Sequence, residues 1–125
     1  MVRRITTGSP FEAAIGYSRA VVAEGWVFVA GTTGYDYQTM IMPQTIEDQC
    51  RNALATISDA LAEAGTSLDN VVRVRYILPD PADWPACWPI VSGAFGKARP
   101  AATMMSAALQ EPEMKIEIEV TARVA

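Results

Sequence analysis

The apolar positions between Thr45 and Ala64 recur at three- and four-residue spacing, the pattern of an amphipathic helix. Thr45 is a favourable N-cap, and acidic residues fill the first turn, where the helix dipole favours negative charge. Gly65 suits the position just after the last turn, where a left-handed backbone is common. The spacing therefore predicts a helix over this segment. Cys50 lies on its apolar stripe, so we expect it in the core.

A second helix is predicted from Asp83, as its cap, to about Phe95. Pro85 is tolerated in a first turn, but Pro89 would lie in the interior, where a missing N–H breaks the hydrogen-bond ladder. We expect a kink or a late start there. Cys87 lies in this segment, and we expect it to be buried, inert and not bonded to Cys50.

Runs of β-branched and aromatic residues predict strands on either side of these helices. The predicted strands are Val21-Val22, Trp26–Ala30, Val71–Leu78, Thr103–Met105 and Met114–Val124. Glu24-Gly25 suits a tight hairpin turn between the first two. Gly31 and Gly34 follow the second strand, and glycine at such a place often marks a bulge or a close backbone approach by a ligand.

The last strand alternates strictly between apolar and polar side chains. Its apolar set is Ile116, Ile118, Val120 and Ala122, and its polar set is Glu117, Glu119, Thr121 and Arg123. Two helices can cover only one face of a sheet, so the polar set lies on a face without helices. That face is either solvated, as pattern alone favours for an antiparallel sheet, or packed against another subunit with its charges paired.

Length and composition fit one folded domain over residues 1–125. The chain is 50% apolar and only 19% charged, which disfavours disorder. Its net charge of −4 and pI near 4.7 disfavour nucleic acid as a partner, because an acidic chain repels phosphates. No apolar run is long enough to span a bilayer, and the N-terminus lacks the apolar region of a secretory signal. We therefore expect a cytoplasmic protein without a membrane partner.

The chain contains no histidine. This excludes Ser-His-Asp and Cys-His nucleophile systems and every zinc site that uses histidine. The two cysteines stand 37 positions apart, and no run of carboxylates has the spacing of a metal loop. We expect no metal and no cofactor, and the sequence contains no complete catalytic set of a standard kind.

Several local motifs, taken in order, resemble the RidA family, also called the YjgF family and known as endoribonuclease L-PSP. They are Gly16-Tyr17-Ser18-Arg19-Ala20-Val21, Val27–Gly31, Gln49–Leu54, Ala62–Val72, Arg99-Pro100-Ala101 and Ile116-Glu117-Ile118-Glu119. None is decisive alone, but the ordered set covers nearly the whole chain.

The resemblance implies an α+β, chorismate-mutase-like fold: a mixed, mostly antiparallel sheet with two helices packed on one face. It also implies a homotrimer in which the helix-free faces meet at the centre and three ligand clefts lie between subunits. A charged layer between subunits would then consist of Arg73, Arg75, Glu117, Glu119 and Arg123. Since buried charges are costly unless paired, we predict that these residues pair.

The resemblance further implies a small-molecule ligand and a site. Family enzymes hydrolyse enamines or imines, using an arginine for the substrate carboxylate and a last-strand glutamate for water. Tyr17 and Gly31 match family cleft positions, and Glu119 is matched to the glutamate. Ala102 stands where the family has its arginine, and Trp88 stands where deaminating members often have asparagine.

The loss of that arginine removes the usual carboxylate clamp from the segment Arg99–Thr103. Arg99, three residues before Ala102, and Arg19, two residues after Tyr17, are the candidates to replace it, and Thr103 is a further candidate for the cleft. Each of the two arginines could instead be an ordinary surface residue. Deamination of substrates that resemble 2-aminoacrylate is therefore expected to be weak or absent.

The sequence leaves three candidate functions for this protein. The first is hydrolysis of a non-standard imine or enamine; the second is a non-catalytic module that binds or senses a metabolite. The third, ribonuclease activity, ranks last, because the chain is acidic and lacks both histidine and a basic–aromatic groove.

Overall fold

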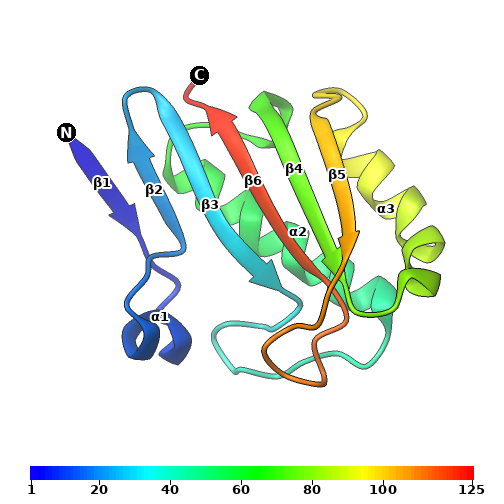
Figure 1. Ribbon diagram of the computed structural model, residues 1–125. Helices are drawn as coiled ribbons and strands as arrows, with labels where there is room; N and C mark the ends of the chain where they lie inside the picture. The colour runs from blue at the N-terminus through cyan, green and yellow to red at the C-terminus, as the bar shows by residue number, and fades with distance from the viewer.

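The computed structural model describes residues 1–125 and shows a single six-stranded sheet with the strand order β1-β2-β3-β6-β4-β5 (Figure 1). The strands are β1 Val2–Ile5, β2 Ala20–Ala23, β3 Trp26–Thr33, β4 Val71–Leu78, β5 Ala101–Ser106 and β6 Glu117–Arg123. The helices are α1 Pro10–Ile15, α2 Ile46–Glu63 and α3 Trp84–Phe95. Only the β4–β5 pair is parallel, so the predicted α+β class with a mixed, mostly antiparallel sheet is confirmed.

The predicted hairpin is present between β2 and β3. Glu24 and Gly25 have φ angles of 53° and 80°, the positive values that a two-residue hairpin turn with the right twist requires. β3 is longer than predicted and has a register irregularity between Val29 and Thr32, around Gly31. The glycine therefore marks a bulge, as the sequence indicated.

The long helix α2 begins and ends as predicted. The Thr45 hydroxyl accepts a hydrogen bond from the backbone N–H of Asp48 at 3.1 Å, and Gly65 follows the helix with φ of 87°. Helix α3 has the predicted bounds, with Asp83 in the N-cap position, but the Asp83 side chain makes no capping hydrogen bond. Asp80 instead caps a 3₁₀ turn over Pro81–Asp83, and that turn leads directly into the helix.

Helix α3 continues through Pro89, which neither delays its start nor ends it. Pro89 has no N–H to donate to the Pro85 carbonyl, but both prolines are exposed, so that carbonyl is on the solvent side of the helix.

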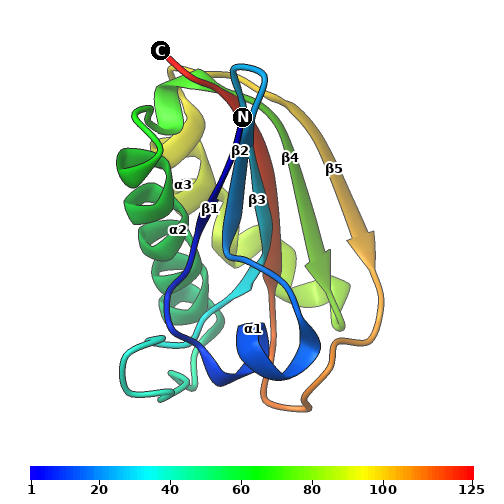
Figure 2. The same cartoon turned by 90° about the vertical axis from the view of Figure 1, so that its left-hand side faces the viewer.

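Helices α2 and α3 both cover the same face of the sheet (Figure 2). The apolar side chains of β6, Ile118, Val120 and Ala122, are buried beneath them, while Glu117 and Glu119 point to the other face. Cys50 and Cys87 are both buried and unbonded, which confirms their role in the core. None of the helices is long and apolar enough to cross a membrane.

The other face of the sheet has no helix over it (Figure 2). Arg123 lies over the Trp26 ring at 4.7 Å, and Phe28 is exposed beside them. Of the five charged residues that we expected on this face, only Arg75 and Glu119 form an ion pair within the protomer. This face therefore combines exposed aromatic surface with charges that the protomer itself leaves unpaired.

Candidate functional site

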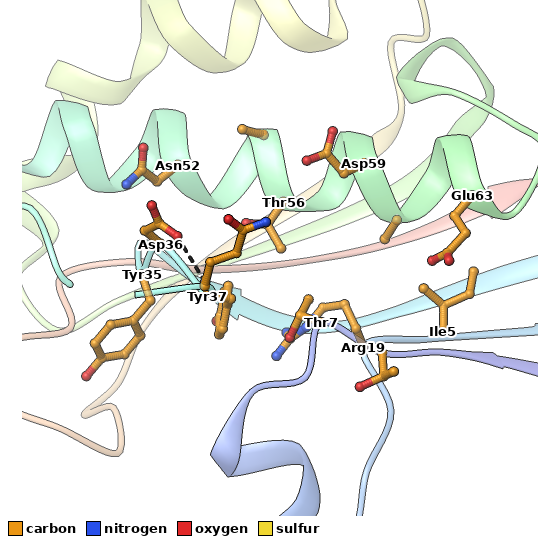
Figure 3. Close-up of a pocket in the computed structure, with 14 residues that line it drawn as sticks. Ile5, Thr7, Arg19, Tyr35, Asp36, Tyr37, Asn52, Thr56, Asp59 and Glu63 are labelled. Carbon is orange, nitrogen blue, oxygen red and sulfur yellow. Dashed lines mark hydrogen bonds between the residues drawn. The ribbon is translucent and has the colours of Figure 1, made fainter. Parts of the chain in front are cut away.

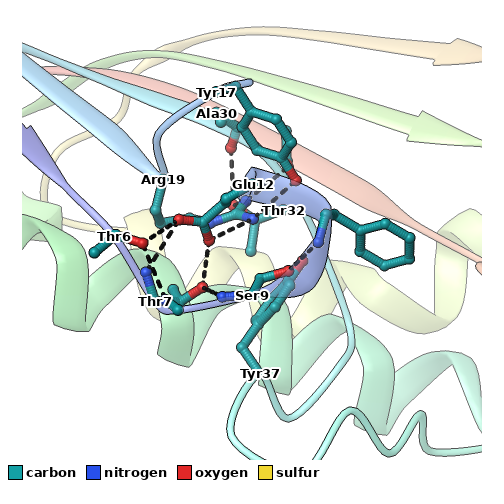
Figure 4. A network of polar contacts seen from close by, with 12 residues as sticks. Thr6, Thr7, Ser9, Glu12, Tyr17, Arg19, Ala30, Thr32 and Tyr37 are labelled. Atoms are coloured by element: carbon teal, nitrogen blue, oxygen red, sulfur yellow. Dashed lines mark hydrogen bonds and ion pairs between the residues drawn. The ribbon is translucent and has the colours of Figure 1, made fainter. Parts of the chain in front are cut away.

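Arg19 is the centre of a buried polar network beside the β2 and β3 strands (Figure 4). Its side chain is 0% exposed. One guanidinium nitrogen donates to the Gly31 carbonyl at 2.8 Å and to the Thr32 hydroxyl at 3.0 Å. The other donates to Glu12 and to the Tyr17 hydroxyl, both at 3.4 Å. Both terminal nitrogens of Arg19 therefore have partners within the chain, whereas its buried Nε has none, and the residue brings Tyr17 and Gly31 together.

Glu12 is the counter-ion of Arg19, a role that no sequence pattern indicated. Its carboxylate accepts hydrogen bonds from the Thr6 hydroxyl at 2.6 Å, the Thr7 N–H at 3.2 Å and the Thr7 hydroxyl. Burial raises the pKa of Glu12, but these hydrogen bonds and the charge of Arg19 together lower it by more. The pKa of Glu12 therefore lies below its usual value. The pair is consequently charged at neutral pH.

Glu117 lies directly against Gly31. A Cβ atom placed on residue 31 would come within 2.6 Å of Glu117 Oε2, so only glycine leaves room for the carboxylate there. Burial and the neighbouring Glu119 raise the pKa of Glu117, and Arg19 lowers it by a smaller amount. A half-buried carboxyl with a raised pKa is suited to take up and release a proton.

Glu119, the glutamate matched to the family's catalytic position, has a different environment. Its carboxylate lies 3.1 Å from Arg75 on the adjacent strand, and both side chains are 41% exposed. The alternation of β6 gives Glu117 and Glu119 the same pattern, so sequence alone could not separate them. The two glutamates differ in their neighbours on adjacent strands. Glu117 pairs with Thr33 at the end of β3 that contains Gly31, whereas Glu119 pairs with Arg75 on β4.

A second set of the predicted residues gathers between α3 and β5. Trp88, Arg99 and Ala102 line a hollow of about 430 Å³. Its other lining residues are Val74, Tyr76, Val91, Ser92, Phe95, Gly96 and Pro100. Thr103 does not line it, because alternation along β5 turns Thr103 to the opposite face, beside Arg75.

The two sets are kept apart within one protomer. Gly31 on β3 and Ala102 on β5 are separated by the strands β6 and β4 (Figure 1). Three strand spacings amount to about 14 Å. Glu117 also points to the helix-free face, whereas Ala102 faces the helix α3. Within one chain the two sets of residues therefore lie on different faces of the sheet and do not form a single site.

A larger hollow of about 700 Å³ lies between α2 and the loop that follows β3 (Figure 3). Asp36, Asp59 and Glu63 contribute carboxylates to its wall, and the hollow shares Thr6, Thr7, Arg19 and Tyr37 with the buried network. It contains neither Gly31 nor Glu117. No group of three or more cysteine, aspartate or glutamate side chains is arranged to hold a metal ion.

Comparison with known proteins agrees with the fold. Residues 7–124 match the family described as Endoribonuclease L-PSP. The 2-iminobutanoate/2-iminopropanoate deaminase of Capra hircus is 30% identical over 98% of this chain and 90% of the goat protein. A RutC family protein of Pyrococcus horikoshii is 33% identical over 85% of each chain. The crystal structure of a YjgF/YER057c/UK114 family member from Mycobacterium tuberculosis has a TM-score of 0.90 and 40% identity, covering 99% of this chain and 100% of that one. The chain therefore belongs to the RidA/YjgF family.

Proposed function

We propose that this protein hydrolyses an imine, or the enamine in equilibrium with it, to a carbonyl compound and ammonia. The observation that carries the proposal is the position of Glu117: a half-buried carboxyl of raised pKa, held against the backbone of Gly31 and close to the Tyr17–Arg19 network. The family supports the reaction class, since one relative is named 2-iminobutanoate/2-iminopropanoate deaminase.

The chemistry requires only proton transfer. With the imine protonated on nitrogen, the Glu117 carboxylate takes a proton from water as the water oxygen bonds to the imine carbon and the C=N π pair moves to nitrogen. The Glu117 carboxyl then gives this proton to the nitrogen of the resulting carbinolamine. The C–N bond breaks with its electron pair leaving on ammonia, the hydroxyl proton passes to Glu117 as the C=O bond forms, and transfer of that proton to ammonia restores the carboxylate. Each step moves one proton to or from the Glu117 carboxyl, whose pKa is raised by burial and by Glu119. An enamine first takes a proton on carbon to become the imine.

The buried network would fix the geometry of this carboxyl. Arg19 holds the Gly31 carbonyl at 2.8 Å, and its guanidinium lies 4.7 Å from the Tyr37 ring, so the bulge at Gly31 has little freedom to move. Tyr17 is half-buried at the edge of the same network, where its hydroxyl can contact a ligand. Arg19 is thus a positioning residue in this proposal and Glu117 is the residue that acts on water.

A complete site would require two subunits. The protomer separates the Glu117 half from the Ala102 half, and its helix-free face leaves Phe28 and several charges exposed. Packing of three such faces in a homotrimer would cover the aromatic surface and bring the β5 edge of one subunit to the Gly31 end of another. The proposal therefore includes a homotrimer with three inter-subunit sites.

The test is ammonia release from imino acids produced in place by an amino-acid oxidase, measured with and without the protein. Glu117→Gln should reduce the catalysed rate at least a hundredfold, because it removes the proton acceptor. Glu119→Gln is the matched control, two residues away on the same strand face, and should retain most of the rate. Equal rates for wild type and Glu117→Gln would refute the proposed role.

Ala102 favours one alternative, a non-catalytic module that binds a metabolite. A methyl group cannot provide the charge-assisted hydrogen bonds that an arginine gives a carboxylate. Under this alternative a metabolite would raise the melting temperature, while no imine would be turned over faster than in buffer.

A further inference from the structure

The hollow between α3 and β5 has the walls of an apolar binding pocket. Val74, Tyr76, Val91 and Phe95 are buried side chains that form its floor, and Trp88, 54% exposed, stands at its rim. Its volume of about 430 Å³ lies within the range of about 300–1,000 Å³ typical of small-ligand sites. The hollow is wide open to solvent, so an apolar group can lie against Trp88 and the exposed parts of these walls.

The small side chain of Ala102 keeps this space open. The residue lines the hollow from the edge strand β5, opposite the Trp88 side of α3. A long side chain at this position would extend across the hollow and fill part of it. An alanine at this position therefore leaves room for a larger ligand than a long side chain would.

Arg99 supplies a single positive charge at the mouth of this pocket. It is the only charged residue among those that line the hollow, and no carboxylate is present there. It takes part in none of the protomer's four ion pairs and donates no side-chain hydrogen bond, so its guanidinium is available to a ligand.

The backbone at Arg99 is held in an uncommon conformation. Its φ is 51°, and its N–H donates to the Phe95 carbonyl at 2.8 Å, which closes the end of α3. A non-glycine residue at positive φ costs some free energy, so the surrounding contacts determine this geometry. The conformation fixes the start of the Arg99 side chain next to the pocket.

We infer that, within the proposed function, this pocket selects substrates with a large apolar side chain and that Arg99 holds their carboxylate. The substrate class is then the 2-imino acids related to bulky apolar amino acids, rather than those with one or two side-chain carbons. Arg99 replaces the missing clamp from a different position in the loop, and the apolar side chain of the substrate packs against Trp88 and Phe95. Arg19, which is buried and whose two terminal nitrogens already have partners within the chain, lies outside this pocket.

Binding can be measured without turnover. Calorimetric titration with 3-phenylpropionate, propionate and 3-phenylpropanol separates the apolar contribution from the charged one. The wild type should bind 3-phenylpropionate at least tenfold more tightly than propionate. Arg99→Ala should weaken 3-phenylpropionate about tenfold, which corresponds to about 1.4 kcal/mol, and leave 3-phenylpropanol unchanged. Lys97→Ala, an exposed cation outside the pocket, is the matched control and should change neither.

A second variant tests the pocket itself. Ala102→Arg should weaken 3-phenylpropionate by filling the space and strengthen propionate by restoring a clamp. Unchanged 3-phenylpropionate binding in Arg99→Ala, no preference for 3-phenylpropionate over propionate in the wild type, or no effect of Ala102→Arg would each overturn the inference.

These results are independent of the proposed reaction. Retained binding with no ammonia release from any imino acid would refute the proposed function and leave the pocket assignment standing. Release of ammonia from small and large imino acids at equal efficiency would refute the selectivity and leave the reaction standing.

Discussion

Replacement of Arg19 by methionine should destabilise the protein strongly although it changes no surface residue. Arg19→Met keeps a long side chain but removes the charge, and it leaves Glu12 as a buried carboxylate without a counter-ion. Breaking a buried pair by removing one partner costs about 3–5 kcal/mol. Glu12 keeps its three hydrogen bonds from Thr6 and Thr7, so we expect the lower end of that range.

A loss of about 3 kcal/mol should lower the melting temperature by about 10 °C for a domain of this size. The assay is thermal and urea unfolding of wild type, Arg19→Met, Glu12→Gln and the double variant, followed by circular dichroism. The double variant should be more stable than the sum of the single losses predicts, because neither charge is then left alone. If the melting temperature of Arg19→Met lies within about 2 °C of the wild-type value, the Arg19–Glu12 pair does not stabilise the fold as argued.

The pH dependence provides an internal check. The pKa of Glu12 lies below its usual value in the folded protein, so its stabilising contribution is present at neutral pH and is lost as the pH falls through that lowered value. In Arg19→Met the lowering by Arg19 is absent. The stability difference between wild type and variant should therefore be largest near pH 7 and shrink below about pH 4.

Three further predictions follow from the same structure. Gly31→Ala should reduce turnover at least tenfold, because the added Cβ displaces the Glu117 carboxylate. The urea midpoint should change little, since the Glu117 side chain is half-exposed and can shift. Unchanged turnover would contradict the placement of Glu117 against Gly31. The value of kcat/KM should fall on the acid side of its pH profile at the pKa of Glu117, which is raised. Glu119→Gln should move this acid limb to lower pH, because Glu119 helps to raise the pKa of Glu117. An acid limb that stays in place would exclude this effect of Glu119. Cys50 and Cys87 should react with a thiol reagent only in denaturant, because both side chains are inaccessible in the folded protein. Contact with Cys87 and burial also raise the pKa of the Cys50 thiol, which lowers its reactivity. Rapid labelling of the native protein would contradict the burial of the two thiols.

Much of the fold could be predicted from local pattern. The helix α2, the β2–β3 hairpin and the alternation of β6 each have a strong sequence signal, and all three are present. The strand β1 and the helix α1 were missed, because Val2–Ile5 shows no alternation and forms a strand only by pairing with β2. The last strand is shorter than predicted at both ends, since alternation continues into residues that lack a cross-strand partner.

The site was predicted only in part, for a physical reason. Sequence motifs indicated Tyr17 and Gly31, and the structure joins them through Arg19. The difference between Glu117 and Glu119 depends on which cross-strand neighbour each one meets, a fact that alternation does not contain. The burial of Arg19 could not be predicted either, because Glu12 is seven residues away with no pattern to connect the two.

The most direct test of the central claim, a hydrolytic site built from two subunits, is a subunit-mixing experiment. Glu117→Gln and Arg99→Ala damage different halves of the proposed site, so each variant alone should release little ammonia from the imino acid of phenylalanine. After the two are unfolded and refolded together in equal amounts, a random trimer should contain both intact halves at about a quarter of its sites. Recovery of about a quarter of the wild-type rate is the predicted result. A mixture no more active than the separate variants would contradict the claim that one subunit supplies Glu117 and its neighbour supplies Arg99.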